Sequence, residues 1–289
     1  MTISFVKKTS PYSHWEYSNL EYDSLIKIVP ERGGLITEWI SEGKELLYFD
    51  LERFMDKEKS VRGGIPILFP ICGDLSEGYQ VGDKKYFLKQ HGFARDLPWS
   101  IGLNKDNLGI SLKLSDSDDS RSSFPFFFTL KMDVCVTAKS LHISVKIYNQ
   151  SQDAMPFGFG LHPYFQVSDL HKIKIDGLPG KCIDQTNMKV TNTSDQIRIL
   201  NKGVDFLSYP SSSSSSSVKL FDSLSRNVIE LIHQEPLDTT VIWTDPPRQM
   251  VCLEPWTSPR NSLVTGDRKL EVKPNEYIEL LTIFKHDSF

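Results

Sequence analysis

The sequence predicts an all-β protein, built as a large antiparallel β-sandwich. Strand-like apolar runs recur along its 289 residues, and clusters of Gly, Pro and Ser separate them. No long stretch repeats its apolar side chains every 3.6 residues, as an amphipathic helix would. Strands that do not alternate with helices pair mainly with one another, so a sandwich or barrel is favoured over an α/β fold.

The first clear strand is Leu25–Val29, a β-branched run that ends at Pro30. Tyr48–Met55 is the best candidate for a short helix. Two long strand-like runs, Phe126–Val136 and Leu141–Asn149, follow with only four residues between them, which predicts an antiparallel hairpin. In the second run apolar and polar side chains alternate, as in a strand with one buried face.

The C-terminal half continues in the same style. Further strands are predicted at residues 173–175, 218–220, 228–232, 240–244, 250–254 and 277–285. The serine run Ser211–Ser217 is either an interdomain linker or a surface loop. We favour a loop, because similar strand-like runs lie on both sides of it. Residues 1–289 are therefore expected to form a single domain.

The composition is that of an ordinary globular protein, with 39% apolar and 24% charged residues. A net charge of -4 argues against non-specific binding to nucleic acid. No run approaches the ~20 apolar residues that span a bilayer, and Met1–Ser10 is polar, unlike a signal peptide. The four cysteines lie far apart without a C-x-x-C pair, which predicts free, mostly buried thiols. We expect a cytoplasmic protein, because free thiols are typical of a reducing compartment.

Three local sequences carry the residues that are best suited to chemistry. They are Arg62–Pro70 with Gln90–Arg95, then Gly158–Phe165, then Val251–Trp256. Glu254 closes an apolar strand, and it is either solvated there or buried, in which case a raised pKa would suit it to act as a base. His162 lies among aromatic residues and is either a hydrogen-bonded core residue or an acid catalyst.

Each of the other candidate residues has two interpretations, a role in ligand binding and a purely structural role. His91 precedes a glycine and is either a turn residue or a ligand contact. Arg62 and Arg95 suit phosphate or carboxylate recognition, or else form surface ion pairs. Three indole rings could stack on a sugar or pack in the core, namely those of Trp99, Trp243 and Trp256.

A metal site is a weaker interpretation of the same residues. His91, His162 and Glu254 are a known type of ligand set. They are dispersed, however, and the chain has no H-x-H or H-E-x-x-H spacing. We therefore favour acid–base chemistry and expect no metal or other cofactor.

At these motifs the sequence resembles the aldose 1-epimerase superfamily. The runs R-G-G-I-P-x-L-F-P, Q-H-G-F-A-R, G-L-H-P-Y-F and L-E-P-W-T occur in the family's order. Each motif is moderately specific, and their ordered combination is highly specific. The resemblance extends over nearly the whole chain and is closest to the hexose-6-phosphate mutarotases and to bacterial relatives that accompany lactose and galactose genes. It implies a galactose-mutarotase-like β-sandwich that interconverts the α and β anomers of an aldohexose.

The resemblance also implies roles for individual residues. His162 matches the general acid at the ring oxygen, and Glu254 matches the base at the anomeric hydroxyl. His91 matches a sugar-binding histidine, and Asp205 is the best match to a sugar-binding aspartate. The hexose-phosphate branch usually has an arginine directly after that aspartate, whereas this chain has Phe206.

The identity of the sugar rests on two arginines. Arg62 and Arg95 are placed as in the hexose-6-phosphate branch, where such residues hold the phosphate, so we favour glucose 6-phosphate over a free hexose. The run Pro66–Gly73 resembles relatives that act on unphosphorylated sugars equally well.

Two other functions fit the sequence less well. The first is a non-catalytic sugar-binding or sugar-sensing protein on the same scaffold, since fold alone does not establish activity. The second is a glycoside hydrolase, which usually needs two carboxylates. Asp245 and Glu254 are the obvious pair, but Asp245 begins an Asp-Pro-Pro run that is typical of a turn.

Overall fold

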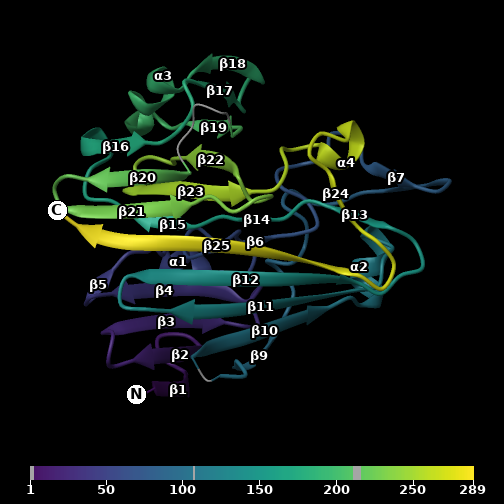
Figure 1. Ribbon diagram of the computed structural model, residues 1–289, viewed down its shortest axis with the longest axis horizontal. Helices are drawn as coiled ribbons and strands as arrows, with labels where there is room; N and C mark the ends of the chain where they lie inside the picture. Colours follow the sequence, from purple (N-terminus) through teal and green to yellow (C-terminus); the bar gives the residue numbers. More distant parts are fainter. Residues whose placement is uncertain (1–2, 107, 211–215) are drawn as a thin grey trace.

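The computed structural model describes residues 3–106, 108–210 and 216–289. Strands dominate these residues, and the helices between them are short (Figure 1). The helical segments are α1 (Leu51–Met55), α2 (Asp118–Ser123), α3 (Thr193–Ile197), α4 (Ser262–Thr265) and the 3-10 turns Leu170–Lys172 and Leu200–Lys202. Within the described residues, no helix has the length and apolar character needed to cross a membrane.

The first sheet, which we name the N-terminal sheet, is a meander of five strands in sequence order. Its strands are β1 (Ile3–Lys8), β2 (His14–Asn19), β3 (Ser24–Val29), β4 (Leu35–Ser41) and β5 (Lys44–Glu45). All four neighbouring pairs are antiparallel. It lies at the bottom of Figure 1 and includes the predicted strand Leu25–Val29.

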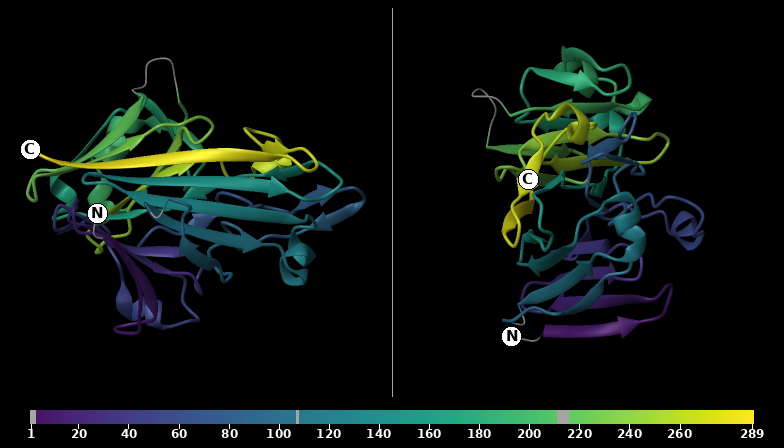
Figure 2. Two further views of the ribbon diagram at one scale, coloured as in Figure 1. Left: turned by 60° about the horizontal axis from the view of Figure 1, so that its bottom comes forward. Right: turned by 90° about the vertical axis from the view of Figure 1, so that its right-hand side faces the viewer.

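The second sheet, the β12 sheet, has eight strands and runs across the middle of the molecule (Figures 1 and 2). In spatial order its strands are β16 (Ile173–Asp176), β20 (Ser217–Asp222), β21 (Asn227–Ile232), β25 (Tyr277–Ser288), β12 (Ser140–Asn149), β11 (Phe128–Val136), β10 (Gly109–Ser115) and β9 (Ser100–Leu103). The predicted hairpin is confirmed as the antiparallel pair β11–β12, in which buried and less buried residues alternate.

The third sheet, the β23 sheet, carries the candidate site residues Asp205 and Glu254. In spatial order its strands are β18 (Lys189–Asn192), β17 (Lys181–Asp184), β19 (Asp205–Ser208), β22 (Thr239–Trp243), β23 (Met250–Trp256), β14 (Gly160–Leu161) and β6 (Ile67–Leu68), and β15 (Tyr164–Gln166) also pairs with β23. Two small ribbons complete the fold, β13 (Met155–Phe157) with β24 (Leu270–Val272) and β7 (Tyr79–Val81) with β8 (Lys84–Tyr86).

The antiparallel all-β architecture predicted from the sequence is confirmed. One apolar core cluster draws on all three large sheets, with members such as Ile26, Val145 and Leu253. The predicted helix Tyr48–Met55 is shorter than expected, because Asp50 caps the helix and Phe49 forms a β-bridge with Gly63. The residues 211–215 of the serine run lie outside the described residues.

The turn that carries His91 depends on a glycine. His91 and Gly92 have backbone φ angles of 65° and 71°, in the left-handed region. The backbone of Gly92 lies against Phe69, so an added Cβ atom would come within 2.1 Å of the Phe69 carbonyl oxygen. Only a residue without a side chain fits there. The close approach fixes the turn, because the amides of Phe93 and Ala94 donate to the same carbonyl oxygen.

We predict that Gly92→Ala destabilises the protein much more than Gly82→Ala. Gly82 has a similar φ of 57° but nothing within 4 Å of an added Cβ atom, so it isolates the cost of the backbone angle. The cost of the backbone angle is about 1–2 kcal/mol. In Gly92→Ala, forcing the new methyl group into the core should add about 1–3 kcal/mol. Urea unfolding of both variants measures the difference. Equal losses of stability would contradict the argument.

Candidate active site

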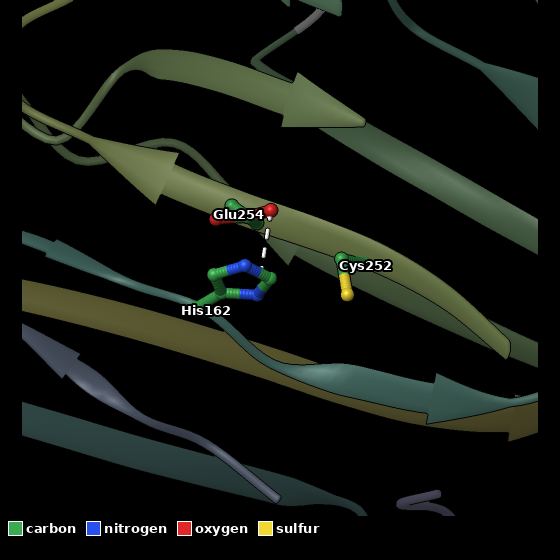
Figure 3. Close-up of side chains that lie close together, drawn as sticks. All are labelled: His162, Cys252 and Glu254. Carbon is green, nitrogen blue, oxygen red and sulfur yellow. Dashed lines mark ion pairs between the residues drawn. The ribbon is translucent and has the colours of Figure 1, made fainter. Parts of the chain in front are cut away.

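The centre of the site is the strand β23, all of whose residues are buried. Cys252 and Glu254 are two residues apart, so their side chains lie on the same face of the strand. His162 lies in the short connection between β14 and β15, both of which pair with β23. The two strands hold the imidazole beside the carboxyl group, and the side chains of His162, Cys252 and Glu254 lie close together (Figure 3).

His162 and Glu254 form a buried pair. Their Nδ1 and Oε1 atoms are 3.4 Å apart, and the two residues are 8% and 1% exposed. The two atoms are not aligned for a hydrogen bond, so Nδ1 has no hydrogen-bond partner among the described residues. The other carboxyl oxygen of Glu254 accepts a hydrogen bond from the Trp256 indole, at 3.1 Å.

Burial disfavours the charged form of both members of this pair. It raises the pKa of Glu254 well above its usual range, and the negative charge of Asp205 adds to this effect. It also lowers the pKa of His162 to about 3, helped by the positive charges of Arg95 and Arg62. In the absence of a ligand the pair therefore favours a protonated carboxyl group beside a neutral imidazole.

His91 lies beside the pair. Its ring makes edge-to-face contacts with the rings of His162 and Trp256, at centroid distances of 5.6 and 5.7 Å. The Gly73 amide donates to His91 Nδ1 at 3.1 Å, and burial holds the pKa of His91 well below its usual range. The neutral ring therefore carries its proton on Nε2, where it can donate to a ligand.

Asp205 is held by two side chains that the sequence analysis did not identify. Gln185 Nε2 donates to Asp205 Oδ1 at 2.6 Å, and the Arg260 guanidinium lies 3.4 Å from Asp205 Oδ2. Arg260 also donates to Gln185 Oε1 at 3.0 Å. Arg260 follows the late L-E-P-W-T motif closely, which was the available signal for it, whereas nothing in the local sequence marks Gln185.

Arg62 and Arg95 both lie close enough to His162 to lower its pKa. The Arg62 guanidinium is stacked over Trp243, 5.3 Å from the ring centroid, and its Nε atom is 3.7 Å from Asp245. Arg95 donates to the Gln90 carbonyl at 2.9 Å. Asp245 is thus held in an ion pair, which argues against its use as the second carboxylate of a glycoside hydrolase.

The surroundings of the pair are aromatic. Tyr164 stacks on His162 with a centroid distance of 4.7 Å, and Trp243 meets His162 edge-on at 5.7 Å. Trp99 instead packs in the core, where its indole donates to the Ala94 carbonyl. A cavity of about 1060 Å³ lies mainly beside α1 and the first residues of the chain; it reaches Arg95 and Tyr164, but His91, His162 and Glu254 do not line it.

The structure brings together a candidate metal-ligand set that differs from the set of His91, His162 and Glu254 considered from the sequence. The ligand atoms of His162, Cys252 and Glu254 all lie within 4.8 Å of one another. The set includes Cys252 in place of His91, whose Nδ1 atom already accepts a hydrogen bond from Gly73. All four cysteines are free thiols, and Cys135 alone is only half-buried.

Two known proteins of similar sequence carry the name of an epimerase. A protein from Cenchrus ciliaris named "Putative glucose-6-phosphate 1-epimerase" is 30% identical over 158 residues, which are 50% of this chain and 45% of the relative. A protein of the same name from Escherichia coli is 28% identical over 160 residues, which are 54% of this chain and 50% of the relative. The chain thus matches about half the length of these curated relatives.

Solved structures share the fold over the whole chain. The Slr1438 protein from Synechocystis sp. PCC 6803 is 35% identical, with a TM-score of 0.91 and 100% of each chain covered. A galactose mutarotase-like protein from Clostridium acetobutylicum is 16% identical, with a TM-score of 0.83 and 99% of each chain covered, and it shares the fold. The galactose-mutarotase-like fold that the motifs imply is therefore confirmed.

A family model described as aldose 1-epimerase matches residues 24–284, which is most of the chain. This match agrees with the order of the four sequence motifs and with the architecture of the three sheets. The protein belongs to the aldose 1-epimerase family.

Proposed function

We propose that this protein is a mutarotase that interconverts the α and β anomers of an aldohexose, with glucose 6-phosphate as its preferred substrate. The observation that carries the proposal is the buried His162–Glu254 pair, whose facing nitrogen and oxygen atoms are 3.4 Å apart. Family membership supports an epimerase, and the names of the curated relatives support the phosphorylated sugar.

The proposed reaction needs one base and one acid. Glu254 accepts the proton of the C1 hydroxyl, and His162 donates a proton to the ring oxygen while the bond between C1 and that oxygen breaks. The C1–C2 bond of the open aldehyde rotates, and ring closure on the other face returns both protons. The sugar is neither oxidised nor reduced and no group is transferred, so the reaction requires no cofactor.

Burial of the pair favours the proton transfers of ring opening. The pair begins as a carboxylate and an imidazolium, and it ends as a carboxyl group and a neutral imidazole. Because burial raises the pKa of Glu254 and lowers that of His162, it stabilises the second state relative to the first. Hydrogen bonds from bound sugar hydroxyls to the carboxylate would stabilise the first state.

The neighbouring residues would orient the sugar. His91 would donate its Nε2 proton to a sugar oxygen, and Asp205 would accept from a sugar hydroxyl. Gln185 and Arg260 would hold the Asp205 carboxylate in a fixed position, since both contact it directly. Such positioning fixes the reacting atoms relative to the acid and the base.

A phosphate group would contribute more than binding energy. Arg62 and Arg95 could hold a phosphate dianion through charge-assisted hydrogen bonds. The same two guanidinium groups lower the pKa of His162. A bound dianion would offset their positive charge, so it would favour the protonated imidazole that the reaction requires. This link supports a phosphorylated substrate over a free hexose.

We predict that Glu254→Gln and His162→Asn each lower kcat for anomer exchange by at least ~10²-fold, because a positioned acid or base typically contributes ~10²–10⁴-fold. The double variant should be little worse than either single one, since both groups act in one exchange. Two-dimensional NMR exchange spectroscopy on glucose 6-phosphate measures the rates. His286→Asn is the control, because it removes a buried histidine whose partners are Ser41 and Asn227. Near-wild-type exchange in both site variants would refute the assignment and favour a non-catalytic sugar-binding protein.

We predict that Glu254→Gln also stabilises the folded protein above about pH 5. Because burial raises the folded-state pKa of Glu254, its contribution to stability is fully present below the unfolded-state value of 4.5 and is lost as the pH rises toward the folded-state value. Glutamine does not ionise, so the variant escapes this loss and should be more stable than wild type at pH 7 by more than at pH 4. Unfolding in urea at pH 4 and pH 7 measures the difference. A variant-minus-wild-type difference that does not change with pH would contradict the buried carboxyl group.

We predict that wild type has a higher kcat/KM for glucose 6-phosphate than for glucose. Arg62→Ala and Arg95→Ala should each reduce kcat/KM for the phosphorylated sugar about 10–100-fold, which corresponds to the loss of one charge-assisted hydrogen bond. The value of kcat/KM for glucose should change much less. Arg121→Ala is the control, because Arg121 pairs with Asp116 on another part of the molecule. If wild type were equally or more active on free glucose, the preference for a phosphorylated sugar would be wrong, and the protein would be a general aldose mutarotase.

A further inference from the structure

The catalytic pair shares its pocket with a thiol that the proposed reaction does not use. Cys252 precedes Glu254 by two residues on β23, so its sulfur projects from the same face toward His162 (Figure 3). The imidazole nitrogen, the sulfur and a carboxyl oxygen all lie within 4.8 Å of one another. All three residues are buried, and Cys252 is fully so.

The three donor atoms are free of strong competing interactions. His162 Nδ1 is buried without a hydrogen-bond partner among the described residues. The recorded contact of the Cys252 thiol is a weak one to the Met250 sulfur, at 3.8 Å. Glu254 uses one oxygen to accept from Trp256, and the oxygen that faces His162 is the other one. A buried polar atom without a partner costs free energy that a bound ion would recover.

The donor set suits zinc. One imidazole, one thiolate and one carboxylate are ligands that Zn²⁺ accepts together in a tetrahedral site, at distances of about 2.0–2.3 Å. Ligand atoms at those distances and tetrahedral angles are about 3.4 Å apart, which is the separation of His162 Nδ1 and Glu254 Oε1. The sulfur lies within 4.8 Å of the other two ligand atoms and must move inward where that separation exceeds the tetrahedral spacing. The fourth position remains for water or for a sugar oxygen.

The charges of such a site balance. Zn²⁺ would displace one proton from the Cys252 thiol and one from the Glu254 carboxyl group, and both protons would go to the solvent. A thiolate, a carboxylate and a divalent cation sum to zero charge, which a buried site tolerates. Magnesium and calcium prefer oxygen ligands and are poorly suited to this set.

We propose that His162, Cys252 and Glu254 form a zinc-binding site that inhibits the enzyme reversibly by occupying its acid and its base. Zinc binding itself does not depend on the proposed function, whereas the inhibition rests on it. The site is therefore inhibitory rather than catalytic, so the enzyme should be active when it is prepared with a chelator.

The test compares wild type with Cys252→Ala, which removes the sulfur ligand and keeps the acid–base pair. In wild type, Zn²⁺ should abolish anomer exchange on glucose 6-phosphate, Mg²⁺ should not, and EDTA should restore the rate. Cys252→Ala should exchange anomers but bind Zn²⁺ at least ~10–100-fold more weakly, since even partners outside the ligand set alter metal affinity by that factor. Cys72→Ala is the matched control, because Cys72 is also fully buried near Glu254 but lies outside the ligand set.

A second readout does not require activity. Co²⁺ added to wild type and to Cys72→Ala should give the absorption of a thiolate-to-cobalt charge transfer, and Cys252→Ala should not. Isothermal titration with Zn²⁺ in two buffers should show proton release on binding. The proposal is overturned if wild type binds no Zn²⁺, or if Cys252→Ala binds Zn²⁺ and Co²⁺ as wild type does. Co²⁺ absorption without any anomer exchange in wild type would retain the metal site and reject the mutarotase.

Discussion

The structure depends on one constraint, a carboxyl group buried in the middle of the β23 sheet. Glu254 is 1% exposed and lies in a strand whose residues are all buried. Its carboxyl group contacts the Trp256 indole and the His162 imidazole. Such a group is expensive to ionise. The fold meets this constraint by placing a neutral imidazole beside it, and by supporting that imidazole through two strands that both pair with β23.

The same burial links stability to chemistry. The folded protein is most stable with the proton on the carboxyl group, which is also the state the pair would reach once a sugar ring has opened. The positive charges of Arg62 and Arg95 reinforce this preference by lowering the pKa of His162. Under the proposed mechanism the pair must ionise before the reaction begins, so the site would give up stability for function, as active sites often do. Substrate groups that restore the charged pair would act as activators as well as ligands.

Much of the fold and part of the site follow from the sequence. Alternating apolar residues predicted the β11–β12 hairpin, because a sheet with one buried face requires that period. Glu254 stands out locally as a carboxylate that closes a predicted apolar strand, whereas Asp205 is identified only through the family resemblance. Phe206 lies on the face of the strand opposite Asp205 and is fully buried in the core, and the guanidinium that contacts Asp205 comes from Arg260, 55 residues later. Pairing of β17 with β19 brings Gln185 to Asp205, and no local pattern reports such pairing. Cys252, by contrast, lies on the same strand as Glu254.

The most direct test of this account is the protonation state of the pair in the ligand-free protein. Carbon-13 NMR of the Glu254 carboxyl group, assigned with Glu254→Gln, and nitrogen-15 NMR of the His162 ring, assigned with His162→Asn, report the two sites separately. The account predicts a carboxyl group that stays protonated well above pH 4.5 and an imidazole that stays neutral well below pH 6.5. A carboxylate beside an imidazolium at pH 6 would contradict it.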